Sequence, residues 1–315
     1  MPKVTKKLGN NKARAWESLG FAHKKKLCQH FDTTSYQQEQ NDVSIKKVIQ
    51  MRLYIFLISI VCCTGISRAQ YNPQINELKW SDEFNYEGVP DPAKWSYEEG
   101  LVRNEEAQYY TKEREKNVRV ENGCLVIEAH KEKYGNMEYT SGSIHTNDKL
   151  EFSGGRIEAR VKVPAGKGTW PAIWTLGHKW PDQPHPACGE IDILEYVGYM
   201  PKEFFVNVHT PADCQKERHS VNVYGTASYV ENAAEDFHIF ALEWYEDCLK
   251  FFVDEKCTYV YHKDPQRPDH WRFDFDNPQF LILNLAIGGV WGGEQGIDDS
   301  IFPVKYYVDW VRYYK

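Results

Sequence analysis

The sequence predicts an all-β protein, and three features of residues 70–315 lead to this fold class. Short runs of strand-forming residues recur between Gly, Pro, Asn and Asp turn signals, as in a sandwich or a barrel. No long helical periodicity and no internal repeat interrupts these runs. The segment is also long enough to form one large β domain. The predicted strands are 124–129, 155–163, 190–196, 204–209, 237–244, 249–253, 280–287 and 306–314.

The first 69 residues are expected to lie outside this domain. Residues 1–50 are polar and lack apolar periodicity, which predicts a disordered leader or an extension of the gene model. Residues 51–69 combine a basic start, an apolar run and a small-residue cleavage pattern, which is typical of a secretory signal peptide. A signal-anchor helix is the alternative, although the apolar run is shorter than the roughly 20 residues that span a membrane. We therefore expect a secreted, extracellular protein that starts at Met51 and has residues 70–315 as its mature domain.

Charge is divided unevenly between these two parts of the chain. Residues 1–69 carry 12 Lys and Arg against 4 Asp and Glu, whereas residues 70–315 carry 26 against 41. This acidic balance argues against a nucleic-acid partner or an anionic membrane surface. It suits a neutral or cationic substrate, and we expect a monomer that has no membrane contact after signal removal.

The most informative stretch is GEIDILE at 189–195, in which three carboxylates are separated by apolar residues. Strict alternation directs Ile191 and Ile193 to the core and Glu190 and Asp192 to the other face of a strand. It would also direct Glu195 into the core, where a carboxylate without a partner is costly. One extra residue between Asp192 and Glu195, a β-bulge, returns Glu195 to the face of the other two carboxylates.

Three like charges on one strand face repel one another, so stability alone does not favour them. Glycoside hydrolysis uses such groups: one carboxylate attacks the sugar, and a second, protonated one donates to the leaving oxygen. The alternative is a solvated acidic strand edge. Because the carboxyl groups of a retaining pair lie about 5–5.5 Å apart, we expect a strand that curves toward the acids.

Cysteine usage adds little to this picture. Residues 70–315 contain five cysteines, so at least one thiol would stay unpaired in an oxidising compartment. Cys188 and Cys214 flank the predicted hairpin of strands 190–196 and 204–209 and are the preferred disulfide pair. No CxxC pair or Cys/His cluster in the sequence indicates a zinc site.

Seven further motifs accompany the acidic stretch. They are WSDEFN (80–85), NEEAQYYT (104–111), SGSI (141–144), GRIEAR (155–160), WPAIW (170–174), LNLAIGG (283–289) and VDWVRYY (308–314). In this order they resemble the laminarinases, the endo-β-1,3-glucanases of glycoside hydrolase family 16, over roughly residues 75–315. The resemblance implies a β-jelly-roll sandwich of two curved antiparallel sheets with a concave substrate cleft. It makes residues 70–315 a catalytic domain.

The resemblance also implies roles for the three carboxylates. Glu190 matches the nucleophile of a retaining mechanism, Glu195 the general acid/base and Asp192 the assisting carboxylate. Two residues separate Asp192 from Glu195, as in the laminarinase branch, whereas dedicated lichenases have one residue there. This spacing agrees with the bulge inferred from parity. Glu195 has to keep its proton near neutral pH, and the negative charges of Glu190 and Asp192 would raise its pKa.

Substrate-binding residues follow from parity and from the family's cleft positions. Trp170 and Trp174 are four residues apart, which places both on one face of an extended strand, where sugar rings could stack; core packing is the alternative. Glu158 and Arg160 share a parity and are expected to face the cleft, with Arg156 nearer its rim. The other expected cleft residues are Asn104, Asn207, His209, Asn284 and Trp291.

Many members of this family carry a structural calcium ion, and the resemblance implies a site for one here. The matching ligands are Glu83, the backbone carbonyl of Gly123 and Asp309, whose oxygens suit a hard cation. The alternative is a set of ordinary surface carboxylates. No catalytic cofactor is expected.

The resemblance leaves three functions to be compared. The first is retaining endo-hydrolysis of β-1,3-glucan, with mixed-linkage β-1,3-1,4-glucan as a further substrate. The second is a non-catalytic β-1,3-glucan recognition protein of the same fold, in which the catalytic glutamates are typically replaced. The third is a transglycosylase, or a relative that acts on agar or carrageenan. Because Glu190, Asp192 and Glu195 are all present, the sequence favours the glucanase.

Overall fold

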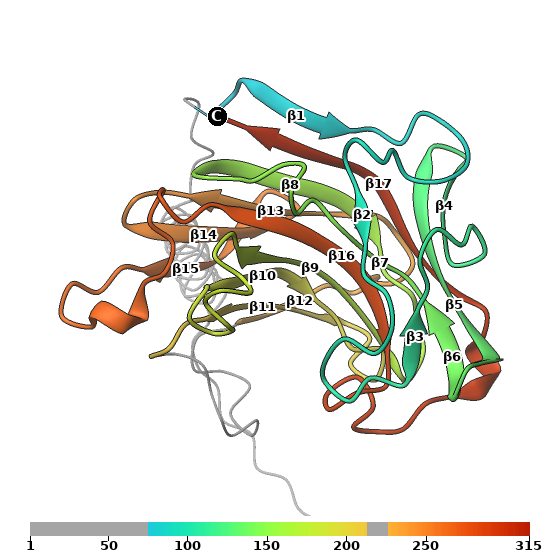
Figure 1. The fold of residues 1–315 in the computed structure, drawn as a ribbon. Coiled ribbons are helices and arrows are strands. Elements are labelled where there is room, and N and C mark those ends of the chain that lie inside the picture. The colour runs from blue at the N-terminus through green and yellow to red at the C-terminus, as the bar shows by residue number, and fades with distance from the viewer. Residues whose placement is uncertain (1–74, 213–225) are drawn as a thin grey trace, which may run out of the picture. The chain divides into compact units, whose positions relative to one another are not determined.

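The computed structural model describes residues 75–212 and 226–315, all of which belong to the unit Ser67–Lys315. The predicted leader (1–50) and the predicted signal peptide (51–69) lie outside the described residues, so these expectations stay predictions. Cys214 also lies outside them, and Cys188, its expected disulfide partner, is a free thiol in the structure. Within the described part of the chain, no helix is long and apolar enough to cross a membrane. Two β-sheets, packed face to face, make up the domain (Figure 1).

The larger sheet has ten strands. Its neighbouring strands pair antiparallel, except that β3 runs parallel to β6. The main path runs, in order, through β15 (Lys256–His262), β14 (Cys248–Val253), β13 (His238–Trp244), β8 (Gly155–Lys162), β17 (Val304–Tyr314), β5 (Cys124–Tyr134), β6 (Met137–Ser141) and β3 (Gln108–Tyr110). Two further strands pair beside this path: β1 (Leu78–Asp82) with β17, and β4 (Val118–Glu121) with β5.

The smaller sheet has seven strands, and it carries the acidic stretch at its centre. Its order is β12 (Thr226–Tyr229), β11 (Glu203–His209), β10 (Glu190–Glu195), β9 (Thr169–Gly177), β16 (Gln279–Ile287), β7 (Ser143–His145) and β2 (Ser96–Tyr97). Two short 3-10 turns, η1 (Pro268–His270) and η2 (Asp299–Ile301), lie in connecting segments.

The core lies between the two sheets and is built from alternate residues of each strand. Ile157 and Ala159 of β8 belong to the same buried cluster as Ile191 and Ile193 of β10, and each is at most 3% exposed. Alternation of this kind buries one face of a strand and leaves the other face for polar groups. The predicted all-β sandwich is therefore confirmed, and the predicted strand at 190–196 is β10, near the centre of its sheet.

Candidate active site

A β-bulge interrupts β10 between the second and third carboxylates. Asp192 lies opposite Asn207 of β11, but the next pair joins Glu195 to Phe205, so that two residues of β10 face one of β11. The pairing of β10 with β9 shifts over the same residues. The predicted bulge is therefore confirmed. It brings Glu195 back to the strand face that carries Asp192.

The two residues of the bulge, Ile193 and Leu194, are both buried, at 1% and 0% exposure. Consecutive residues of a regular strand point to opposite faces, so both side chains can enter the core only where strict alternation is broken. Glu195 then faces the outer side of the sheet and accepts a hydrogen bond from the indole Nε1 of Trp170, at 3.2 Å. The cost of burying an unpartnered carboxylate in the core is avoided.

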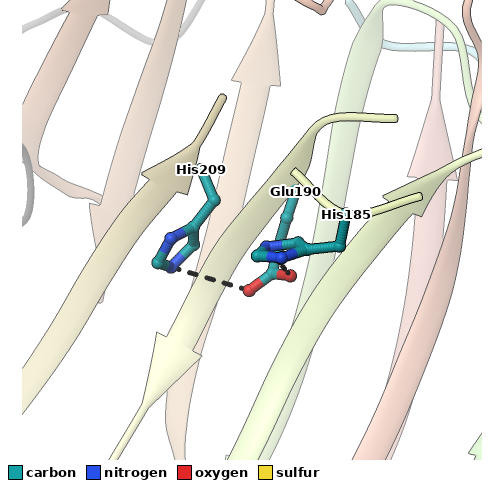
Figure 2. Close-up of side chains that lie close together, drawn as sticks. All are labelled: His185, Glu190 and His209. Atoms are coloured by element: carbon teal, nitrogen blue, oxygen red, sulfur yellow. Dashed lines mark ion pairs between the residues drawn. The ribbon is translucent and has the colours of Figure 1, made fainter. Parts of the chain in front are cut away.

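Two histidines approach the carboxylate of Glu190 (Figure 2), and one of them, His209, also contacts Asp192. His209, which lies opposite Glu190 on β11, has its Nε2 at 3.2 Å from Oδ2 of Asp192 and 3.6 Å from Oε1 of Glu190. His185 approaches from the loop before β10, with its Nε2 at 3.1 Å from Oε2 of Glu190. Asn207 lies beside this group, with its Nδ2 at 3.1 Å from Nε2 of His209.

These neighbours give the three carboxyl groups different pKa values. Burial opposes the ionisation of Glu190, but the adjacent His209 and His185 outweigh it, so the pKa of Glu190 falls below its ordinary value. Burial and the charge of Glu190 raise the pKa of Asp192 to about 6. Burial, followed by the charge of Asp192, raises the pKa of Glu195 well above its ordinary value. The site therefore holds one carboxylate that ionises easily and one carboxylic acid that keeps its proton.

Aromatic side chains form a wall beside Glu195. The ring of Trp170 packs edge-to-face against Trp291, with ring centroids 5.7 Å apart. Trp291 in turn lies 5.0 Å from the ring of Phe205, the β11 partner of Glu195. An apolar wall of this kind excludes water and opposes ionisation of the neighbouring carboxyl group.

Trp174 lies on the same face of β9 as Trp170, because the pairing of β9 with β16 runs without a break. Its Nε1 donates to Oδ1 of Asn284 at 2.8 Å, and Nδ2 of Asn284 donates to the hydroxyl of Tyr110 at 3.0 Å. The guanidinium of Arg103 lies 4.7 Å from the centroid of Trp174. The hydrogen bond to Asn284 and the guanidinium of Arg103 over the ring therefore fix the indole of Trp174, and only 7% of this residue is exposed.

The segment that begins with Asn104 is tied to the end of β16 and to the loop that carries Trp291. The backbone carbonyl of Asn104 accepts from the N–H of Val290 at 3.0 Å. Its side chain donates to Glu106 at 3.4 Å, and Glu106 also accepts from Gln108 at 2.7 Å. The structure thus brings Asn104, Asn207, His209, Asn284, Trp170, Trp174 and Trp291 to the same region as the carboxylates. Their roles in binding stay predictions.

The structure contradicts the prediction that Arg156, Glu158 and Arg160 line this cleft. All three belong to β8, which is a strand of the larger sheet and not of the sheet that carries the acids. The alternate residues Ile157 and Ala159 are the ones that face the acidic sheet through the core. The charged side chains therefore point away from the carboxylates.

Ion pairs on the outer face of the larger sheet account for these charged residues. Arg156 contacts Glu158 at 2.9 Å and Glu243 of β13 at 3.1 Å. Arg160 pairs with Asp309 of β17. Parity correctly predicts that Glu158 and Arg160 share a face, but parity alone cannot say on which of two sheets that face lies.

The two predicted carboxylate ligands of calcium are engaged in other contacts. Both carboxylate oxygens of Glu83 accept from Arg312, at 2.9 and 2.8 Å, and Asp309 pairs with Arg160. Gly123 occupies the turn between β4 and β5 with a φ of +74°. Calcium takes six to eight oxygen ligands, and side chains already bound to guanidinium groups do not fit that role. The calcium site stays a prediction that these contacts do not favour.

Among the residues of the site that were not predicted, Arg103, Tyr110 and His185 lie outside the central strands of the acidic sheet. Each lies in a loop or a short edge strand, where no periodicity reports the direction of a side chain. His185 stands in HPACG, directly before the acidic strand, and only the path of the loop brings its ring back over Glu190.

Comparison with known proteins gives one family. Residues 105–312 match the model of the glycosyl hydrolases family 16. The chain is also 40% identical over 289 residues to a β-glucanase from Rhodothermus marinus, an alignment that covers 87% of this chain and 97% of that protein. The chain belongs to glycoside hydrolase family 16.

Solved structures of this family share the fold. The laminarinase from Rhodothermus marinus is 42% identical with a TM-score of 0.70, covering 76% of this chain and 97% of that one. SCLam, described as a non-specific endo-β-1,3(4)-glucanase of family 16, is 40% identical with a TM-score of 0.71, covering 78% and 93%. The two-sheet sandwich of this family 16 enzyme is therefore the expected β-jelly-roll, and the prediction of a glycoside hydrolase is confirmed.

Proposed function

We propose that this family 16 enzyme cleaves internal bonds of β-1,3-glucan with retention of configuration. The observation that carries the proposal is the bulge, which presents Glu195 on the same face as Glu190 while their surroundings move the two pKa values apart. A retaining mechanism needs this pair, one group ionised and one protonated. The names of the relatives, a β-glucanase and laminarinases, support the choice of substrate.

In the first step, a carboxylate oxygen of Glu190 attacks the anomeric carbon. The bond to the leaving oxygen breaks while Glu195 gives that oxygen its proton, which leaves a glycosyl ester on Glu190. Asp192, whose pKa is about 6, shares a proton with Glu190 and can keep it as the ester forms. In the second step Glu195, now ionised, takes a proton from water, whose oxygen displaces Glu190.

The aromatic residues would bind the glucan beside these acids. Trp170 and Trp291 lie next to Glu195 and offer apolar surface on which sugar rings can stack. Asn207 and His209 offer polar groups beside Glu190 and Asp192. Trp174 is covered by Arg103, so we propose that it supports the cleft floor more than it contacts sugar.

Mixed-linkage β-1,3-1,4-glucan is a second candidate substrate. One relative at 40% identity is described as a non-specific endo-β-1,3(4)-glucanase, and this chain shares its fold. A non-catalytic recognition role is disfavoured, because all three acids are present and their pKa values differ as catalysis requires. We also propose that the protein is secreted through the signal at 51–69 and acts as a monomer.

Release of reducing sugar from laminarin, lichenan and agarose tests the proposal. The full chain should act on laminarin, with or without lichenan, and leave agarose intact. The Glu190→Gln variant, measured in parallel, should be inactive on all three. Absence of reducing sugar from laminarin and lichenan in the folded wild type would exclude the hydrolase, and products longer than the substrate would indicate a transglycosylase. N-terminal sequencing of the secreted protein and light scattering test secretion and the monomer.

A further inference from the structure

Two histidines and the proposed nucleophile converge on one point at the solvent side of the acid cluster (Figure 2). His185, Glu190 and His209 each offer one ligand atom, and these atoms all lie within 4.8 Å of one another. The centroids of the two imidazole rings are 5.6 Å apart. The three residues come from two neighbouring strands and the loop before β10, so the sequence spacing does not reveal them.

The ligand types suit a small tetrahedral metal ion, and the ligand atoms lie close enough for a rotation of the side chains to gather them. Zinc bonds to nitrogen and oxygen of about 2.0–2.2 Å place neighbouring ligand atoms roughly 3.3 Å apart. Nε2 of His185 lies 3.1 Å from Oε2 of Glu190, and Nε2 of His209 lies 3.6 Å from Oε1, the other oxygen of the same carboxylate. One ligand atom from each residue lies within 4.8 Å of the other two, so small rotations of the side chains bring them to tetrahedral spacing. Two histidines and one glutamate, with a water as the fourth ligand, form a known type of open zinc site. Asp192, 3.2 Å from His209, supplies a further carboxylate on the buried side.

Glu190 and His209 lie on paired strands, and His185 lies in the loop before β10. Glu190 and His209 are direct partners on β10 and β11. His185 lies in a loop whose turns are closed by backbone bonds, such as that from the N–H of Gly189 to the carbonyl of Pro186 at 3.1 Å. The side chains of His185, His209 and Glu190 are 40%, 26% and 16% exposed. All three side chains therefore reach the surface of the domain.

We propose that His185, Glu190 and His209 form an inhibitory site for a zinc(II) ion. The bound ion would occupy the carboxylate that otherwise attacks the sugar, and would exclude substrate from the same place. Imidazole nitrogen suits zinc and copper but not the hard cations calcium and magnesium, which prefer oxygen ligands. Zinc binding rests on the geometry alone, whereas the inhibition rests on the function proposed for Glu190.

Calorimetric titration of the full chain with zinc chloride, in a buffer that does not chelate metals, tests the binding. The wild type should bind zinc at this site, and His185→Asn should weaken the affinity at least about tenfold, since even a lost outer partner of a ligand costs 10–100-fold. His178→Asn is the matched control. His178 lies in the same loop and pairs with Glu151, away from the acid cluster. It should bind zinc like the wild type, and magnesium should bind to none of the variants at this site.

Two further readouts separate binding from inhibition. Cobalt(II), which can replace zinc, should give a visible absorption band in the wild type that is lost in His185→Asn and in His209→Asn. Zinc should raise the apparent KM for laminarin, and EDTA should restore it. Equal zinc affinity of the wild type and a folded His185→Asn or His209→Asn variant would overturn the site. If the zinc-free chain fails to cleave any glucan, the proposed function fails, while the titration still decides whether the site exists.

Discussion

The indole Nε1 of Trp170 lies 3.2 Å from Oε1 of Glu195 and donates a hydrogen bond to it. Burial raises the pKa of Glu195, and this hydrogen bond acts in the opposite direction, because a donor favours the charged form. The same ring packs against Trp291 in the apolar wall of the site. Trp170 therefore adjusts the acidity of the proposed proton donor as well as forming the surface beside it.

Replacing Trp170 by Phe should move the alkaline limb of the pH profile of kcat/KM to higher pH. Loss of the donor leaves the carboxylate less stable, so Glu195 keeps its proton to a higher pH. One hydrogen bond of about 1 kcal/mol corresponds to roughly half to one pH unit. Trp174→Phe is the control, since Trp174 bonds to Asn284 and not to an acid. An unchanged alkaline limb in a folded Trp170→Phe variant would show that the bond does not affect the acid.

Replacing Asp192 by Asn should shift the same limb in the opposite direction. After burial, the negative charge of Asp192 is the strongest influence that raises the pKa of Glu195. A neutral amide removes that charge, so Glu195 loses its proton at a lower pH and the alkaline limb moves down. Asp254→Asn, in the turn between β14 and β15, is a distant control that should leave the profile unchanged. An upward shift in Asp192→Asn would contradict the electrostatic account of the site.

Replacing Glu190 by Gln should lower kcat by several orders of magnitude, because the amide cannot form the glycosyl ester. The fold should persist, since Gln keeps the size of the side chain and removes a half-buried charge. Glu158→Gln is the matched control: it alters a carboxylate of the larger sheet and should keep wild-type turnover. Thermal melting followed by circular dichroism checks both variants. Wild-type turnover by a folded Glu190→Gln variant would rule out this nucleophile.

Side chains on the outer face of the larger sheet should not contribute to catalysis. Arg160→Ala should change kcat and KM by less than about twofold. It should change the free energy of unfolding by no more than about 1 kcal/mol, because the ion pair between Arg160 and Asp309 is partly exposed to solvent. Asn207→Ala, on the acidic sheet, should by contrast raise KM or lower kcat. The comparison on laminarin separates the two faces. A large loss of activity in Arg160→Ala would mean that β8 contributes to substrate binding after all.

The strand 190–195 could be predicted in detail from the sequence because burial makes a strict demand on it. Ile191 and Ile193 have to enter the core and Glu195 has to avoid it, and only a bulge satisfies both conditions. The same reasoning failed for Glu158 and Arg160. Their alternation with apolar residues is real, but it describes any strand with one buried face, and two sheets of this fold offer such a face.

Loops carry the parts of the site that the sequence could not predict. Arg103 covers Trp174, and His185 contacts Glu190, from segments without alternation or a fixed turn type. Their positions depend on tertiary packing between elements far apart along the chain, as in the bond between Asn104 and Val290. A pattern within one segment therefore reports which face of a strand is buried, but not which loop side chain lies above it.

The bulge itself gives the last prediction. Deleting Leu194 leaves Glu190, Asp192 and Glu195 at strict period-two spacing, so all three acids stay on the outer face and the register beyond them is kept. The loss of one buried side chain costs about 2–5 kcal/mol, so we expect a cooperative melting transition at lower temperature, reduced activity and a greater share of activity on mixed-linkage glucan. Deleting Ile191 instead, outside the bulge, exchanges the faces of Glu190 and the residues before it and should abolish cooperative melting. If the two deletions melt alike, the bulge does not set the direction of Glu195, and its assignment as the acid/base fails.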